Sequence, residues 1–360
     1  MSQIYSIFPR DIIHVCHDYS KEPQILRFNT VKFRTEVSDA YNFYIPVAVI
    51  SNEKAISCSN RQLSFLPDAY GHYLGDSYAN KLKETYINVL SDTNLIYIDE
   101  PVFQFIDYEA ISGTGHTYDL MFYLLYHFQK SNIKAKLVVC NSSNKYYNTT
   151  LNLIKKYYDV EYLYIDTSQS YVFTTYYCIQ TYQNVFFHYI KEFINQTLID
   201  PIMKYFEEKN EPYFSNIYKI KYYNSDNISG GDFKRSILFD SFCTKYKFKD
   251  LESLDEDYKI YLINKCNTMI ICAGSMYYIN VLYYVKDSSN KHISVVCHSS
   301  NPQTVNDCIT PFENKWRHNL NPFHCANITD QVYCTFTFNG DICIVDSLDT
   351  WINTREIFKE

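Results

Sequence analysis

A histidine and an aspartate at the start of an apolar helical segment form the residue pair with the clearest chemical potential. His116 and Asp119 lie three residues apart in GTGHTYDLMFYLL (Gly113 to Leu125), so on a helix they share a face. A histidine there can act as a general base that removes a hydroxyl proton, and the aspartate can orient it or act alone. In the structural alternative, Asp119 satisfies backbone amides in the first helical turn and His116 packs locally. The spacing alone leaves both interpretations open.

Two other clusters contain residue types that bind metals, but their spacing does not favour a metal site. Asp255-Glu256-Asp257 is an acidic run, yet Ser253 and Glu256 have the spacing of a capping box that opens a helix. His298, His318 and His324, with their neighbouring cysteines, match no closed four-ligand zinc pattern. We therefore expect no metal.

Composition limits the classes of partner. The net charge is −7 and no stretch is dense in lysine or arginine, so we expect no nucleic-acid partner. The 37 tyrosines and 24 phenylalanines accompany many Asn, Ile and Lys residues, all with AT-rich codons. This bias indicates an AT-rich source, such as a large DNA virus or a protist, before it indicates a stacking surface.

The sequence also indicates the cellular environment. Arg10 and Asp11 interrupt the N-terminal apolar residues, and no apolar run reaches the length of a membrane helix. The 12 cysteines form no CxxC pair, which favours reduced thiols. We expect a soluble, cytoplasmic protein with no membrane span, in the host cytoplasm or the virion if the source is viral.

The elements that must position the candidate residues alternate along the chain. Residues 45–51 and 54–59 predict a hairpin, and residues 94–99 and 102–107 predict strands. Met121, Leu124, Leu125 and Phe128 form one stripe of a helix over residues 117–131. A strand at 135–140, a helix at 146–158, a strand at 161–166 and a long helix at 184–209, broken near Pro201, follow. This alternation predicts a parallel, Rossmann-like sheet.

A second alternation follows Pro212, where we place a domain boundary. It comprises, in order, a strand at 217–223, a helix at 233–246, a short strand at 248–251, a capped helix to about 266, a strand at 268–274, a helix at 276–284 and a strand at 292–298. Asn339-Gly340 between alternating runs is the strongest hairpin signal in the chain. Two such units would face a cleft, with ligands outside the carboxyl ends of the strands.

The order of these features resembles the glycosyltransferase family 61 domain over roughly residues 113–300. The matching landmarks are Gly115-His116-Thr117-Tyr118-Asp119 at a helix start, the strand Leu137 to Val139, and YKIKY with Lys219 and Lys221. They continue with Lys234-Arg235 at the next helix, then the turn Ala273-Gly274-Ser275, and Asn280 beyond it.

The resemblance implies a GT-B-like α/β fold with two Rossmann-like α/β/α domains and, here, a C-terminal hairpin extension. Residues 1–212 would form the acceptor side, residues 213–300 the nucleotide-sugar side and residues 301–360 the extension. It implies a hexosyl- or pentosyltransferase that transfers a sugar, with inversion and without a metal, from a donor such as a UDP-sugar to a glycan or glycoprotein. Within that reaction, His116 and Asp119 would be catalytic.

The donor residues follow from the negative charge of a nucleotide diphosphate. Gly274 and Ser275 lack bulky side chains, so backbone amides could approach the phosphates at a helix N-terminus. Lys221 and Arg235 would add positive charge, and Asn280 completes the set by resemblance. The alternative is an ordinary strand-to-helix turn with two solvated basic residues.

Two other function classes stay open. The shortened glycine turn is compatible with a catalytically degenerate transferase-like protein that binds or scaffolds. Another two-Rossmann enzyme, such as a methyltransferase, is disfavoured because no glycine-rich loop follows a first strand.

Overall fold

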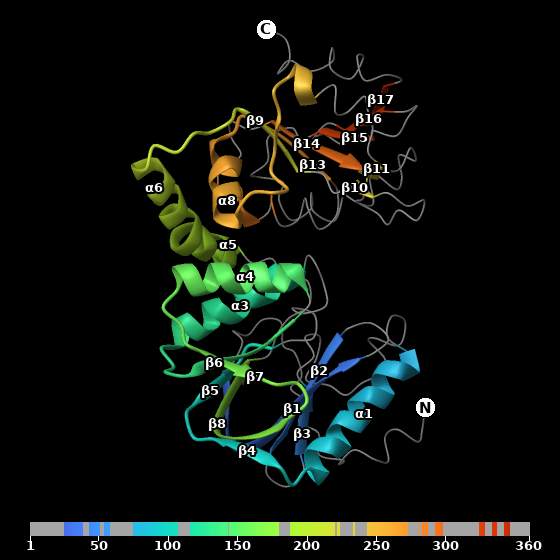
Figure 1. Cartoon of the computed structure of the whole chain (residues 1–360), viewed down its shortest axis with the longest axis vertical. Coiled ribbons are helices and arrows are strands. Elements are labelled where there is room, and N and C mark those ends of the chain that lie inside the picture. The colour runs from blue at the N-terminus through green and yellow to red at the C-terminus, as the bar shows by residue number, and fades with distance from the viewer. Residues whose placement is uncertain are drawn as a thin grey trace. The chain divides into compact units, whose positions relative to one another are not determined.

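The chain forms two compact units, Met1–Ile190 and Lys191–Glu360 (Figure 1). The computed structural model describes residues 25–38, 43–50, 54–57, 75–106, 116–142, 144–179, 188–219, 222–223, 233–234, 243–272, 280, 283–286, 292–297, 324–327, 333–336 and 342–345. The division after Ile190 precedes the predicted boundary near Pro212, because the helical segment that follows Ile190 belongs to the second unit.

The first unit is built on an eight-stranded sheet. Its strands are β1 (Ile25–Ser38), β2 (Phe43–Ile50), β3 (Lys54–Ser57), β4 (Leu95–Ile98), β5 (Val102–Gln104), β6 (Lys136–Cys140), β7 (Tyr162–Ile165) and β8 (Ser170–Ile179). The strand order is β3-β2-β1-β8-β5-β6-β7, and β4 pairs with β8 outside this order. The predicted hairpin is confirmed, since β2 and β3 pair with Ile50 opposite Lys54.

This sheet is mixed, which corrects the expectation of a parallel, Rossmann-like sheet for this half of the chain. The pairs β4-β8, β5-β8, β5-β6 and β6-β7 are parallel, as the alternation predicts. The pairs β1-β2, β2-β3 and β1-β8 are antiparallel. The difference arises because β1 comes before the alternating segment and pairs with β8, the last strand of the unit.

Alternating side chains explain how β1 packs. Val31 and Phe33 are buried, whereas the alternate residues Lys32 and Arg34 are partly exposed, as expected for a strand with one face on the core. Phe33 contacts Phe173 and Tyr176 of β8, with ring centroids 5.5 and 6.0 Å away.

Three helices complete the described part of this unit. The first is α1 (Gly75–Ser91), which packs on β1 and β2. The other two are α3 (His116–Ser131) and α4 (Lys145–Tyr157), and these two lie side by side (Figure 1). The predicted helix over residues 117–131 is confirmed as α3, and its stripe residues Met121, Leu124, Leu125 and Phe128 are buried. α4 begins after Asn144, whose Oδ1 accepts hydrogen bonds from the amides of Tyr146 and Tyr147.

A helical segment begins at His188, at the end of the first unit, and continues into the second. It consists of α5 (His188–Ile194), the π-helical turn η3 (Asn195–Ile199) and α6 (Asp200–Glu208). Pro201 lies in the first turn of α6, where its missing N–H is tolerated. The predicted break near Pro201 is therefore a π turn rather than an interruption.

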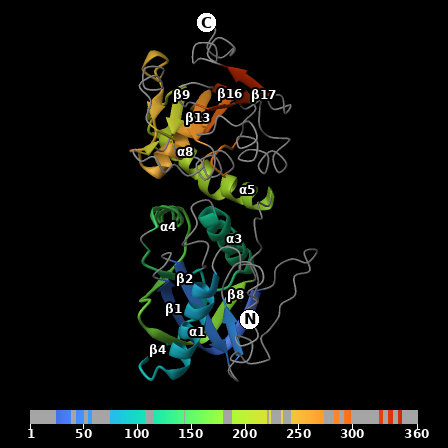
Figure 2. The same ribbon diagram turned by 90° about the vertical axis from the view of Figure 1, so that its right-hand side faces the viewer.

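The second unit contains a five-stranded parallel sheet, and Figure 2 labels two of its strands, β9 (Asn216–Lys219) and β13 (Thr268–Cys272). Its strands are β9 (Asn216–Lys219), β12 (Lys249–Asp250), β13 (Thr268–Cys272), β14 (His292–Cys297) and β15 (His324–Asn327), and α8 (Glu256–Lys265) links β12 to β13. The spatial order is β12-β9-β13-β14-β15, and every pair is parallel. β15 comes from the segment predicted to be an extension.

Two small sheets accompany the larger one. β10 (Tyr222–Tyr223) pairs with β11 (Phe233–Lys234), so the helix predicted to start at Phe233 does not begin there. β16 (Tyr333–Phe336) pairs antiparallel with β17 (Ile342–Val345), as the Asn339-Gly340 signal predicts, although that dipeptide is outside the described residues. Within the described part of the chain, no helix is both long enough and apolar enough to span a bilayer.

Candidate functional site

The strand order of the second unit defines where a ligand site is expected. Numbered along the chain within this five-stranded sheet, the strands run 2-1-3-4-5, a common order of doubly wound α/β sheets. From β9 the chain goes to β12 on one side, and from β13 it goes to β14 on the other. In such sheets, ligands bind at this switch point, outside the carboxyl ends of the two central strands.

Lys219 and Asn280 meet at this switch point. Lys219 is the last residue of β9, and Asn280 lies in the connection that follows β13. Lys219 Nζ donates a hydrogen bond to Asn280 Oδ1 over 3.4 Å, and both residues are buried. Asn280 is therefore the one predicted donor residue whose side chain the structure describes, and it lies next to the basic strand end noted in the sequence.

Glu256 is the central anion of the same region. Its carboxylate accepts hydrogen bonds from the Tyr284 hydroxyl (2.9 Å) and from Lys259 Nζ (3.2 Å). Burial raises the pKa of Glu256, but the nearby charges of Lys219 and Lys259 and the bond from Tyr284 outweigh it, so the pKa lies below the ordinary value. The carboxylate is thus ionised at neutral pH.

This arrangement corrects the predicted capping box. α8 begins at Glu256 with Asp255 as its N-cap residue, and Asp255 makes no side-chain cap bond. Ser253 lies in the turn before the helix. Glu256 lies at the first position of the helix and turns to Tyr284 and Lys259, because these buried groups need an anion.

Several groups fix the backbone after Asn280. Asn264 of α8 donates to the carbonyl of Tyr284 (2.9 Å) and accepts from the amide of Lys286 (2.8 Å). Lys191 of α5 donates to the carbonyl of Tyr283 over 2.6 Å. Burial lowers the pKa of Lys191 well below its ordinary value of 10.5, so its amine loses its proton far more easily than a surface lysine does.

The lysine side chains of this region are buried and bind protein groups, so they can support the neighbouring connections. Two buried lysines, Lys219 and Lys259, lie near one ionised glutamate, and a third, Lys191, binds the Tyr283 carbonyl. Lys219 is only 5% exposed, so its ammonium faces protein groups. Direct contacts to a ligand would therefore come from residues further along the same connections, and the buried groups would hold those connections in place.

The other predicted residues have different outcomes. His116 is the first residue of α3, and Asp119 lies three residues further along the same helix. The prediction that this pair lies at the start of a helix is therefore confirmed. Their side chains are outside what the structure describes. Lys221, Arg235, Gly274 and Ser275 all lie outside the described residues.

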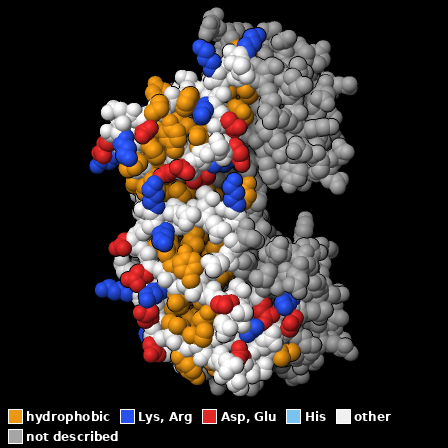
Figure 3. All heavy atoms as spheres, viewed as in Figure 1, with side chains coloured by type: hydrophobic (Ala, Val, Ile, Leu, Met, Phe, Trp, Pro, Cys, Tyr) orange, Lys and Arg blue, Asp and Glu red, His pale blue; other side chains and the backbone are white. Residues whose placement is uncertain are grey.

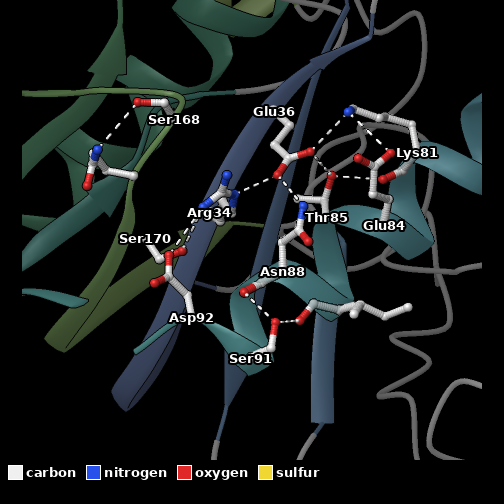
Figure 4. A network of polar contacts seen from close by, with 12 residues as sticks. Arg34, Glu36, Lys81, Glu84, Thr85, Asn88, Ser91, Asp92, Ser168 and Ser170 are labelled. Atoms are coloured by element: carbon white, nitrogen blue, oxygen red, sulfur yellow. Dashed lines mark hydrogen bonds and ion pairs between the residues drawn. The ribbon is translucent and has the colours of Figure 1, made fainter. Parts of the chain in front are cut away.

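A second polar cluster lies in the first unit (Figure 4). Glu36 of β1 accepts hydrogen bonds from Arg34 Nε (2.6 Å), Asn88 Nδ2 (2.8 Å) and Thr85 Oγ1 (3.4 Å), and pairs with Lys81 Nζ at 3.2 Å. Burial raises the pKa of Glu36, while the bonds from Asn88, Arg34 and Lys81 bring it below the ordinary value.

This cluster ties three elements together. Arg34 also reaches Asp92 after α1 and Ser170, the first residue of β8. Ser170 is paired with Leu95, the first residue of β4, so the cluster lies at the amino ends of two parallel strands. Because α/β sheets bind ligands at the carboxyl ends, this position favours a stabilising role.

Sequence reasoning missed Glu256, Lys191 and Glu36 as partners in polar clusters. Lys191 carried a usable signal, since it is a charged residue between Ile190 and Ile194 on an otherwise apolar helical face. Burying the charged amine of such a lysine costs free energy unless a polar group binds it.

On the face drawn in Figure 3, basic and acidic side chains of the described residues are interspersed, and neither sign forms a patch of its own.

Comparison with protein-family models and with curated proteins found no match to this chain.

Proposed function

We propose that this protein is a nucleotide-sugar-dependent glycosyltransferase that binds its donor at the carboxyl edge of the second unit's sheet. The observation that carries the proposal is the parallel order β12-β9-β13-β14-β15, with Lys219 and Asn280 at its switch point. This is the position at which sheets of this kind bind nucleotides. The likeness of the sequence landmarks to family 61 transferases supports the choice of a sugar nucleotide.

The chemistry requires positive charge beside the departing nucleotide diphosphate. Lys219 is already engaged by Asn280 and lies close to Glu256, so we assign the diphosphate to Lys221, two residues further on, and to Arg235. Gly274 and Ser275 follow β13 and would offer backbone amides to the phosphates. Charge stabilisation of this kind needs no metal ion.

The acceptor part of the proposal rests on the first unit. A GT-B arrangement assigns the acceptor, a glycan or glycoprotein, to this unit. His116 at the start of α3 would remove the proton of the acceptor hydroxyl as the sugar is transferred with inversion, and Asp119 would orient it.

Nucleotide binding gives the first test. UDP at millimolar concentration is expected to raise the melting temperature of the purified protein, because a ligand that binds only the folded state stabilises it. Lys221→Ala should abolish the shift. Lys204→Ala is the matched control, since Lys204 is an exposed lysine of α6 and should leave the shift unchanged. If neither UDP nor any other nucleoside diphosphate shifts the melt, the proposal fails.

Transfer gives the second test. With a panel of UDP-sugars, donor hydrolysis or transfer to a glycan should be measurable in the wild type. His116→Ala should retain UDP binding and lose at least about a hundredfold in turnover, as expected for loss of a general base. UDP binding without turnover in the wild type would identify a degenerate, binding-only protein instead.

A further inference from the structure

Asn280 and residues 283–286 are held by charged and polar groups from three different elements. Lys219 of β9 binds the Asn280 side chain, and Lys191 of α5 binds the Tyr283 carbonyl. Glu256 of α8 binds the Tyr284 hydroxyl. We refer to Asn280 together with residues 283–286 as the anchored segment, which follows β13 along the chain.

This set of anchors is more costly than an apolar core would be. Each buried charge loses its hydration, and replacing a buried ion pair with well-packed apolar residues is often neutral or stabilising. Stability alone therefore gives little reason to keep Lys219, Glu256 and Lys259 together under this segment. Directional bonds do offer one thing that apolar packing lacks, which is a single fixed geometry for the backbone they hold.

Glu256 links these anchors. Its two oxygens are divided between Tyr284 (Oε1) and Lys259 (Oε2), so its own orientation is fixed at both oxygens. The charge of Lys219, which holds the other end of the segment through Asn280, lies close enough to favour the ionised carboxylate. Loss of the Glu256 carboxylate would therefore loosen the anchored segment at Tyr284.

We infer that Glu256 is a positioning residue that holds the anchored segment in one geometry beside the switch point, where the donor is proposed to bind. The inference rests on the proposed function and deepens it. Glu256 itself touches no phosphate. It acts through Tyr284, and its contribution is preorganisation, which raises affinity by removing the ordering cost of binding.

The variants separate positioning from folding. Tyr284→Phe keeps the buried ring and removes the hydroxyl that binds Glu256. Glu256→Gln keeps the size of the side chain and removes its charge. Asp255→Asn is the matched control, because this neighbouring carboxylate is exposed and makes no cap bond.

Two measurements on the full chain test the inference. Hydrogen exchange of the free protein should accelerate at least about tenfold in peptides that contain residues 280–286, in both Tyr284→Phe and Glu256→Gln, and stay unchanged in peptides from β6. The Kd for UDP, measured at a temperature where each variant is fully folded, should rise at least about tenfold. A purely structural role would lower the melting temperature and leave the Kd of the folded protein unchanged. The two substitutions should also be non-additive, because they remove the same contact.

The outcomes distinguish the inference from the proposed function. If wild type binds UDP and both variants bind it equally well, positioning is overturned and the proposed function stands. If wild type binds no nucleoside diphosphate, the proposed function fails, and exchange decides whether Glu256 positions the segment at all. Exchange that is unchanged in the segment, or faster across the whole unit, overturns that role. Should Glu256→Gln fail to fold, Tyr284→Phe decides by the same criteria.

Discussion

Glu36 shows how one carboxylate can join a strand to a helix. It is buried on β1, and its hydrogen-bonding partners Thr85 and Asn88 lie on α1, where Lys81 pairs with it. Hydrogen bonds to charged groups contribute about 1.5–3 kcal/mol each, and neighbouring bonds in one network do not add independently.

Glu36→Gln should therefore lower the free energy of unfolding by about 2–3 kcal/mol, since the amide cannot bind Arg34 and Lys81 as an anion does. Urea denaturation measures the change. Glu84→Gln is the control, because Glu84 pairs with the same lysine but its side chain is 56% exposed. Equal effects of the two substitutions would contradict the role given to Glu36.

The pH dependence of stability follows from the same residue. The pKa of Glu36 in the folded protein is below its ordinary value of 4.5. Its stabilising contribution is therefore fully present above about pH 4.5 and is lost as the pH falls through the folded-state pKa. Glu36→Gln should flatten the acid limb of the stability curve, and a curve parallel to wild type below this pH would refute the assignment.

Sequence reasoning reaches some of these residues and not others. Asn280 is predicted by the family resemblance alone, and the structure places its side chain against Lys219 at the end of β9. The sequence predicts Glu256 as part of a helix cap, because its spacing from Ser253 is visible locally. Its actual partner Tyr284 is 28 residues further along the chain and gives no local signal. Glu36 gives no signal at all, since its binding partners on α1 are about fifty residues away and only the fold brings them together.

At the scale of elements, α4 offers a clean test of local sequence rules. Asn144 satisfies two amides of the first turn, with bonds of 2.8 and 3.3 Å to Tyr146 and Tyr147. Asn144→Ala should cost about 1 kcal/mol of stability. Asn152→Ala, on the exposed face of the same helix, should be neutral or slightly stabilising. If both substitutions have the same effect in denaturation, the cap does not stabilise α4.

Elements with strong local signals are predicted well. β6, α4, β7 and β14 lie within two residues of their expected positions, because each carries its own apolar pattern and end signals. β8 is not predicted. Its sequence SYVFTTYYCI is buried along most of both faces, so the alternation that marks a half-buried strand is absent. The helix expected at Phe233 gives way to β11, since pairing with β10 overrides helical spacing there.

At the scale of the whole chain, each unit has its own sheet and its own buried core. Units of this kind are expected to unfold in separate cooperative transitions. Val139→Ala in β6 and Ile270→Ala in β13 both truncate fully buried side chains, at a cost of about 2–5 kcal/mol for such changes. Calorimetry should show each substitution lowering a different transition. A single transition lowered by both would contradict independent units.

The sheet of the first unit could be predicted from the sequence only in part. Alternating strands and helices indicate the parallel part from β5 to β7. Nothing local in the sequence indicates that Phe33 of β1 pairs with Tyr171 of β8, because that register depends on the closure of a long intervening segment.

The pairing of β1 with β8 has a consequence for how the protein is made. On the ribosome, β1 can pair at once with β2, but its other edge must wait until residues 170–179 have emerged. Until then an edge that includes Val31 and Phe33 stays open to strands of other nascent chains. The high contact order of this closing step makes slow folding the expectation for the first unit. Low temperature or added chaperone during expression should therefore raise the soluble yield of the full chain.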